Sequence, residues 1–522
     1  MIIREREREN LNQKQELFRI IWRIANEQRG AIDGWDFKQY VLGTLFYRFI
    51  SENLTKYINS SEEGIDFTLM KDEEITKSGK KECVVEKGFF IYPSQLFCNV
   101  VKKLNNNEFF EKLNENITKN LKEIEASAFG TRSEKNIKGL FDDYDVNSTR
   151  LGSTIHDRNT RLRKLFQAVN DLNFGEFSNN RIDLFGDAYE YLMNMYAANA
   201  GKSGGEFFTP QEVSELLAKI VIGDKKEINK VYDPCCGSGG LLLKFAKILG
   251  KDNVNKGFYG QELNHTTYNL SRINMFLHDI NYGKFNIALG NTLLDPKHKS
   301  DEPFEAIVSN PPYSTNWDGD NNPILINDER FSPAGVLAPK SKADLAFVMH
   351  CLSWLATNGI AAIIEFPGVL YRSGAEQKIR KYLIDHNFID TIIQLPSNLF
   401  FGTSIATCII VLKKSKSEAK TLFVDASKEF ITKTNSNELS EENVNNILKL
   451  VFDKKDVEKK CMLVDNNEIK NNDYNLSVSR YVKIAEEKEE IDIQVLNKQI
   501  DEVVAKINRL RKEIDEVIKE IE

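Results

Sequence analysis

The chain has 522 residues, of which 41% are hydrophobic and 28% are charged, a balance typical of globular proteins. At about 150 residues per domain, this length predicts roughly three structural units. The 70 Lys and Arg against 77 Asp and Glu give a net charge of −7, which argues against a wholly basic nucleic-acid binder.

The first part of the chain has the apolar spacing of helices. Apolar residues recur three and four positions apart from residue 13 to about 60 and from 100 to 195, so we expect an all-helical N-terminal domain over residues 1–175. A Gly-rich stretch at 200–205 ends the helical pattern.

Short apolar runs alternate with helical patterns in the middle of the chain, which is typical of an α/β sheet with helices on both faces. This pattern predicts an α/β domain over residues 176–480. We expect seven strands, at 228–232, 257–261, 285–289, 304–308, 359–365, 389–395 and 406–412. Four helices are expected at 239–249, 266–278, 343–355 and 375–385.

The C-terminal residues 481–522 carry a heptad repeat. Isoleucine recurs every seven residues, and Leu or Val follows three positions later, at Ile493, Leu496, Ile500, Val503, Ile507, Leu510, Ile514, Val517 and Ile521. Ile at the first position with Leu or Val at the fourth favours two-stranded pairing. We therefore expect a C-terminal helix for subunit association, while a helix packed on its own domain is the alternative.

A Gly-rich turn follows the first predicted strand. Asp233 ends that strand, and Gly237, Ser238, Gly239 and Gly240 lead into a helix, whose free N–H groups suit a carboxylate or phosphate. Glu262 ends the next strand, where a carboxylate can bind the two hydroxyls of a ribose. The three-glycine dinucleotide fingerprint and the P-loop are absent, which argues against hydride transfer and ATP hydrolysis.

The sequence Asn310-Pro311-Pro312-Tyr313 directly follows the strand predicted at 304–308. The Asn310 amide oxygen and the Pro311 carbonyl form two acceptors that suit one exocyclic amino group, and Tyr313 can stack on its ring. Drawing both amine hydrogens towards acceptors favours a nucleophilic nitrogen. A simple loop is the alternative for this motif in isolation.

Taken together, these motifs resemble the modification (M) subunits of type I restriction-modification systems. The resemblance covers nearly the whole chain and includes residues 41–49, 183–190, 205–210, 233–239 and 310–313. It implies a Rossmann-like, S-adenosylmethionine-dependent methyltransferase domain that methylates N6 of adenine in duplex DNA without a covalent intermediate. Amino methylation of cytosine N4 or of a protein amide by the same acceptors is the alternative.

The resemblance also implies roles for individual residues. Glu206, Phe207, Phe208, Thr209, Pro210 and Gln211 would wrap the methionine end of the cofactor, Asp233 and Gly237–Gly240 would line the same pocket, and Glu262 would hold the ribose. Asn291 stands where the family usually has Asp, and would accept from the cofactor's adenine amine through its oxygen. Cys235 and Cys236 are expected to be buried thiols, because the nucleophile position of cytosine-C5 enzymes is occupied by Asn310-Pro311-Pro312.

The resemblance further implies partners. A specificity (S) subunit would recognise the DNA site in a complex of two M subunits with one S subunit, and restriction (R) subunits, two per complex, would complete the full assembly. The isolated chain should then bind DNA weakly, with Arg158, Arg161, Arg163 and Lys164 as a candidate basic face.

The intact motifs argue against the alternative of a non-catalytic structural subunit. Without a predicted membrane span, signal peptide, disulfide framework or metal site, a cytoplasmic enzyme is expected.

Overall fold

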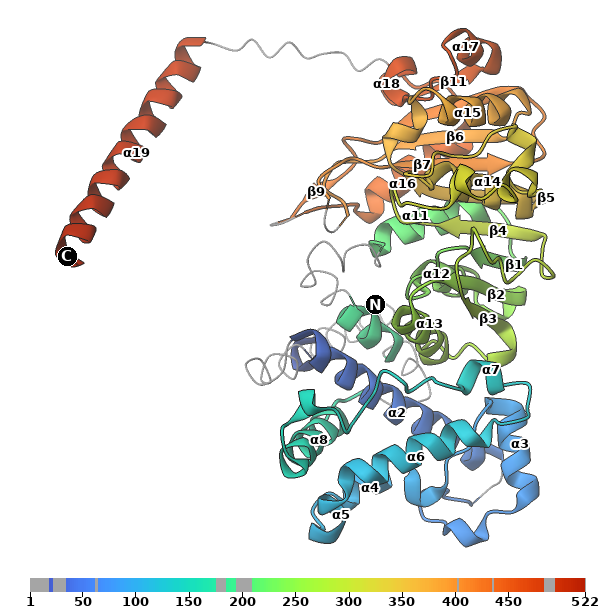
Figure 1. Cartoon of the computed structure of the whole chain (residues 1–522), viewed down its shortest axis with the longest axis vertical. Helices are drawn as coiled ribbons and strands as arrows, with labels where there is room; N and C mark the ends of the chain where they lie inside the picture. The colour runs from blue at the N-terminus through green and yellow to red at the C-terminus, as the bar shows by residue number, and fades with distance from the viewer. Residues whose placement is uncertain are drawn as a thin grey trace, which may run out of the picture. The chain divides into compact units, whose positions relative to one another are not determined.

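The computed structural model describes residues 18–21, 34–61, 64–174, 185–193, 209–400, 403–433, 436–482 and 493–521. The chain forms two compact units, Met1–Val482 and Lys483–Glu522 (Figure 1). None of the described helices is long and apolar enough to cross a membrane.

The N-terminal part is helical, as expected. Its helices are α2 (Gly34–Ser61), α3 (Lys77–Lys87), α4 (Phe97–Lys103), α5 (Asn107–Glu111), α6 (Leu113–Ser127), α7 (Glu134–Ile137) and α8 (Ile155–Asn170), and residues 185–193 are also helical. Local sequence sets where they begin: α8 starts at a capping box in which Thr154 Oγ1 accepts from the Asp157 backbone N–H.

A nine-stranded sheet forms the centre of the second part, so the expectation of seven strands is wrong in number. The strands are β1 (Ile228–Asp233), β2 (Val254–Glu262), β3 (Phe285–Leu289), β4 (Phe304–Ser309), β5 (Leu355–Glu365), β6 (Ile389–Gln394), β7 (Cys408–Lys413), β8 (Lys420–Asp425) and β11 (Cys461–Asp465). The first seven match the predicted strands. β8 and β11 were missed because β8 follows a charged stretch and β11 is a short edge strand with exposed positions.

The strand order is β11-β8-β6-β7-β5-β4-β1-β2-β3. β7 runs antiparallel to both β5 and β6, β11 runs antiparallel to β8, and the remaining pairs in this sheet are parallel. The carboxyl ends of β1, β2, β3 and β4 therefore lie along one edge. A separate pair, β9 (Ile431–Thr432) and β10 (Asn437–Glu438), is antiparallel.

Helices cover both faces of the large sheet, as the unbroken apolar strands predicted. Neighbouring strand residues belong to different cores: Val231 packs into one and Tyr232 into the other. Side chains of α11 (Gln211–Ile222), α12 (Gly240–Leu249), α13 (His265–Leu277) and α16 (Glu441–Asp453) fill the first core. Those of α14 (Asp344–Trp354), α15 (Ala375–Asp385), α17 (Asn466–Asn471) and α18 (Val478–Tyr481) fill the second.

The helical part and the sheet share the first of these cores. Phe46 of α2 and Phe276 of α13 lie with ring centroids 6.2 Å apart. The buried Arg272 of α13 donates to the carbonyls of Lys135 and Lys138, at 3.2 and 2.9 Å. Because packing is continuous across the expected domain boundary, the division at residues 175/176 stays a prediction.

The second unit contains helix α19 (Ile493–Ile521), which spans the heptads. The described members of its apolar seam are between 43% and 58% exposed, at Ile500, Val503, Val504, Ile507, Leu510 and Ile514. An apolar stripe of this length on a helix favours a partner.

Candidate active site

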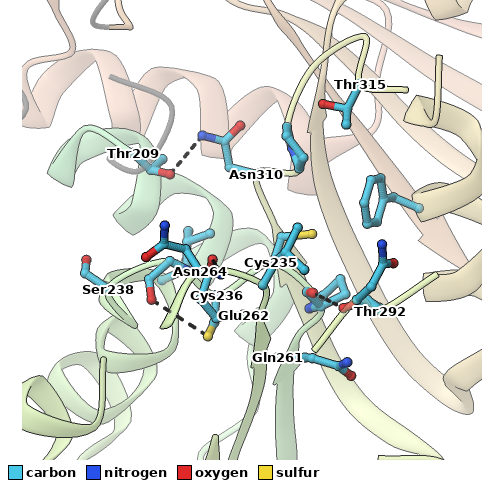
Figure 2. Close-up of a pocket in the computed structure, with 18 of the residues that line it drawn as sticks. Thr209, Cys235, Cys236, Ser238, Gln261, Glu262, Asn264, Thr292, Asn310 and Thr315 are labelled. Carbon is cyan, nitrogen blue, oxygen red and sulfur yellow. Dashed lines mark hydrogen bonds between the residues drawn. The ribbon is translucent and has the colours of Figure 1, made fainter. Parts of the chain in front are cut away.

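A pocket of about 510 Å³ opens at the carboxyl ends of β1, β2, β3 and β4 (Figure 2). It brings together residues that lie far apart in the sequence. Of the predicted site residues, those that line it are Thr209, Gln211, Gly237, Ser238, Gly240, Glu262, Asn291, Asn310 and Pro312. Glu206, Phe207 and Phe208 lie outside the described residues, whereas Pro210, Asp233, Gly239, Pro311 and Tyr313 are not in its lining.

The Gly-rich turn connects β1 to α12 beneath this pocket. Gly237 and Gly239 have φ values of 52° and 81°, a left-handed conformation that favours glycine. A Cβ on Gly239 would also lie 3.1 Å from Met275 Cε. The Cys236 N–H donates to the Gln261 carbonyl at 3.0 Å, which fixes the turn against the end of β2.

Asp233 is fully buried at the start of this turn. Its Oδ1 accepts from the Cys235 N–H at 2.9 Å and from Ser309 Oγ at 3.1 Å, but its Oδ2 has no hydrogen-bond partner among the described residues. Burial, with a smaller contribution from the nearby Glu262 charge, raises the pKa of Asp233 to about 7. An unpartnered buried carboxylate oxygen is costly, so this position suits a cationic or hydrogen-bond-donating ligand.

Glu262 is held in place at the end of β2. Its Oε2 accepts from the Gly237 N–H at 3.0 Å, and its Oε1 accepts from the Asn264 N–H at 2.8 Å. Burial raises the pKa of Glu262, although these bonds oppose the shift. The carboxylate has lone pairs left for the hydroxyls of a ligand.

The side chain of Asn291 differs from its expected arrangement. Its Oδ1 accepts from the backbone N–H groups of Leu293 and Leu294, at 3.0 and 3.2 Å. The oxygen that was expected to accept from a ligand amine is therefore already engaged by the turn.

Asn310 lies between two hydroxyl groups. Its Nδ2 donates to Thr209 Oγ1 at 3.0 Å, as Figure 2 shows, and its Oδ1 accepts from Tyr313 Oη at 2.6 Å. Thr209 belongs to the segment predicted to hold the cofactor. The two predicted sites are thus joined by one hydrogen bond.

Tyr313 does not line the open pocket. Its ring packs against Phe366, with the centroids 4.3 Å apart and the planes inclined by 38°. Burial raises the pKa of Tyr313 well above its usual range, so its hydroxyl remains a donor at neutral pH. In this arrangement Tyr313 contacts Asn310 and Phe366, and its predicted stacking on a target base requires a different rotamer.

Sequence reasoning missed several residues that line the pocket. Gln211 Oε1 and Asn274 Oδ1 are buried acceptors without partners, and Asn274 Nδ2 donates to the Ser238 carbonyl at 2.9 Å. Of these two, Gln211 was predicted through the resemblance, whereas Asn274 was missed because nothing in the helical pattern around it distinguished it. Leu263 and Phe347 add apolar surface; Leu263 is 68% exposed directly after Glu262.

The two cysteines of the turn are free thiols, and the expected burial is complete for Cys236 but only partial for Cys235. Cys236 is buried, Cys235 is half-buried, and burial raises the pKa of each well above the usual range. Neither therefore has the character of a thiolate nucleophile.

The candidate basic face on α8 has local partners. Arg158 donates to the Gly152 and Asn147 carbonyls, at 2.9 and 2.8 Å, and Arg161 donates to the Leu151 carbonyl at 2.6 Å. The guanidinium of Arg163 lies 4.3 Å from the centre of the Phe110 ring. These contacts give at least three of the four side chains a structural role.

The sequence and fold are similar to those of known proteins. Residues 180–490 match the family described as N-6 DNA Methylase, and residues 17–169 match the HsdM N-terminal domain. The chain is 49% identical to the type I restriction enzyme MpnII methylase subunit of Mycoplasma pneumoniae, over 99% of this chain and 98% of that protein.

Two solved structures share the fold. The methyltransferase subunit of a type I restriction-modification system from Streptococcus thermophilus has a TM-score of 0.81 and 33% identity, over 90% of this chain and 100% of that one. A chain from a structural study of type I restriction-modification complex assembly has a TM-score of 0.65 and 18% identity, over 98% and 99%.

Proposed function

The chain belongs to the N-6 DNA methylase family, as a methylase subunit of a type I restriction-modification system, and on this premise we propose how its site works. The enzyme is an adenine-specific DNA methyltransferase. We propose that it uses S-adenosylmethionine, which supplies a methyl group on a positively charged sulfur. The single observation that carries this proposal is the hydrogen bond between Asn310 and Thr209 in the lining of the pocket.

Unpartnered acceptors in the pocket lining, together with Asp233 buried behind it, fit the charged end of this cofactor. Asp233 Oδ2, Gln211 Oε1 and Asn274 Oδ1 are buried oxygens to which no group in the described part of the chain donates. The α-ammonium of a methionine group has three N–H donors, and its charge favours the ionised form of Asp233. We assign these three side chains to the ammonium and Glu262 to the ribose hydroxyls.

Asn310 acts on the target amine. Its Oδ1 accepts from Tyr313 and keeps a second lone pair for one amine hydrogen, while the Pro311 carbonyl takes the other. Both acceptors favour the form of N6 whose lone pair is free. That lone pair would take the methyl group that bound S-adenosylmethionine would supply, the C–S electron pair would stay on the sulfur of S-adenosylhomocysteine, and the excess N6 proton would pass to water. Catalysis then rests on positioning rather than on an acid–base pair.

Two roles remain for Tyr313. In the described arrangement it orients Asn310, and we propose that its ring turns towards the extruded base when DNA binds. Its hydroxyl is a permanent donor at neutral pH, because burial keeps its pKa high.

The charged residues beside the apolar seam of helix α19 favour a specificity subunit, rather than a second copy of this chain, as its partner. In a parallel pair of identical α19 helices, Lys506 would face Arg511 of the other copy, because they occupy the flanking positions of successive heptads. That repulsion disfavours a parallel pair of identical α19 helices. We propose that a helix of the S subunit covers it, in a complex of two M subunits and one S subunit that the R subunit joins.

Methylation assays of the co-expressed M and S subunits test this function. The product should be N6-methyladenine in duplex DNA, formed only when S-adenosylmethionine is present. Methylation of cytosine N4 or of a protein amide would overturn the assignment of the substrate. The proposed compartment is the cytoplasm, where the host DNA of such a system is found.

A further inference from the structure

We propose that Asn291 binds the adenine ring of the cofactor as a hydrogen-bond donor, through its side-chain NH2 group to ring nitrogen N1. It does not accept from the 6-amino group. This inference rests on the proposed use of S-adenosylmethionine. It states which atom of the purine ring the site recognises, and so how the site distinguishes one purine from another.

The orientation of the Asn291 amide follows from its backbone partners. The Leu293 N–H donates to the side-chain oxygen at 3.0 Å. The Leu294 N–H is shared between this oxygen and the Asn291 backbone carbonyl, at 3.2 Å from each. An NH2 group cannot accept these bonds, so the oxygen must occupy this position. Both lone pairs of the oxygen are thereby used, and Nδ2 is the group left for the pocket that Asn291 lines.

The turn that fixes this orientation is itself held on several sides. Thr292 Oγ1 donates to the Pro234 carbonyl at 2.6 Å. The guanidinium of Arg330, which is 3% exposed, donates to the Thr292 and Leu293 carbonyls at 2.8 and 2.7 Å. Asp328 pairs with the same guanidinium at 2.7 Å. A reversal of the Asn291 amide would therefore break bonds that a rigid network maintains.

The order of the strands places Asn291 at the base end of the ligand. The Gly-rich turn follows β1, Glu262 ends β2, and Asn291 comes after β3, the edge strand. The Gly290 N–H donates to the Glu262 carbonyl at 2.9 Å, so the residue before Asn291 is bonded to the last residue of β2. A ligand with methionine at β1 and ribose at β2 extends its base towards β3. The purine edge remote from the sugar carries N1, an acceptor, beside the 6-amine, a donor.

The replacement of Asn291 by Asp provides a matched control. Asp can accept from the same two N–H groups, so the turn is retained, but its second oxygen can only accept at neutral pH. The affinity of the wild type for the cofactor should therefore depend on N1, and the affinity of the N291D variant should depend on the 6-amine.

Calorimetric titration of the full-length chain tests this directly. The three ligands are S-adenosylhomocysteine, its analogue with CH in place of N1, and its analogue with hydrogen in place of the 6-amine. For the wild type, loss of N1 should weaken binding about tenfold and loss of the amine less than about threefold. In N291D this order should reverse.

The outcomes distinguish the donor role of Asn291 from the use of S-adenosylmethionine as cofactor. If loss of the amine weakens wild-type binding at least as much as loss of N1, Asn291 is not the proposed donor. If N291D does not fold, the two analogues still test the wild type. If S-adenosylhomocysteine itself does not bind, the proposed cofactor is wrong, which is distinguishable from the failure of this inference.

Discussion

Tyr313 donates its hydroxyl to Oδ1 of Asn310 over 2.6 Å, so the aromatic residue of the catalytic loop orients the amide that precedes it by three positions. The Thr209 hydroxyl holds the other end of the same amide. Asn310 is thus positioned before any substrate binds, and preorganised acceptors are the main source of catalysis in this account.

Removal of the Tyr313 hydroxyl should separate its two roles. The Y313F variant keeps a ring for stacking and loses the bond to Asn310, worth about 1 kcal/mol. We expect kcat for DNA methylation to fall about fivefold in Y313F, with little change in KM for the cofactor. In Y313A, kcat should fall far more. Steady-state methylation by the M–S complex measures both. Wild-type kcat in Y313F would show that the hydroxyl does not position Asn310.

Cofactor affinity should depend on pH through Asp233. Burial raises its pKa to about 7, so below that pH its carboxyl is protonated and must lose a proton to pair with an ammonium. The Kd for S-adenosylmethionine should fall as pH rises from 6 to 8, by at most about tenfold per unit. The D233N variant removes this titration.

The same carboxyl has the opposite effect on the ligand-free fold. The unfolded chain ionises Asp233 at its ordinary, lower pKa, so the stability contributed by this group is present below about pH 4 and is lost as pH rises through about 7.

Calorimetric titration with S-adenosylmethionine from pH 6 to 8, with D233N as control, measures the effect of Asp233 on cofactor affinity. A wild-type Kd that rises, or that matches the D233N profile, would contradict the assignment.

Charges introduced into the seam of α19 should weaken association with the specificity subunit. Ile507 and Leu510 are 46% and 43% exposed, and an I507D/L510D variant would bury two carboxylates in the proposed interface. The N508D variant places the same charge outside the seam as a control. We expect co-purification to be lost for the first and kept for the second. Deletion of residues 490–522 should also weaken association with the specificity subunit. Unchanged assembly of the deleted chain on a sizing column would refute the assignment of α19 to this interface.

Arg272 should stabilise the junction between the helical part and the sheet. It is 1% exposed, and its removal leaves the Lys135 and Lys138 carbonyls without these donors. We expect R272A to lower the free energy of unfolding by about 3 kcal/mol, as measured by denaturant titration. R132A, at an exposed position, is the control. Equal effects of the two variants would show that the junction does not depend on Arg272.

Much of this fold follows from sequence periodicity. The seven predicted strands and four helices of the α/β part are confirmed, because buried parallel strands are unbroken apolar runs and helices repeat apolar residues every three to four positions. β8 and β11 were missed because β8 follows a charged stretch that hides its apolar run, and β11 is an edge strand with exposed positions.

The site could be predicted by residue type but not by hydrogen bonding. Asp233, Glu262 and Asn310 could be predicted as candidates because they end or directly follow strands, and strand ends converge at one edge. The orientation of the Asn291 amide depends on the backbone of the following turn and on Arg330, which lies nearly forty residues away. The Tyr313 contact with Phe366 likewise depends on a residue after another strand.

Transfer of a labelled methyl group from S-adenosylmethionine to duplex DNA, by the M–S complex with wild-type chain or with N310A, tests the central claim most directly. The wild type should yield labelled N6-methyladenine. N310A should yield none, while calorimetry shows that it still binds the cofactor. Full methylation by N310A would contradict the account.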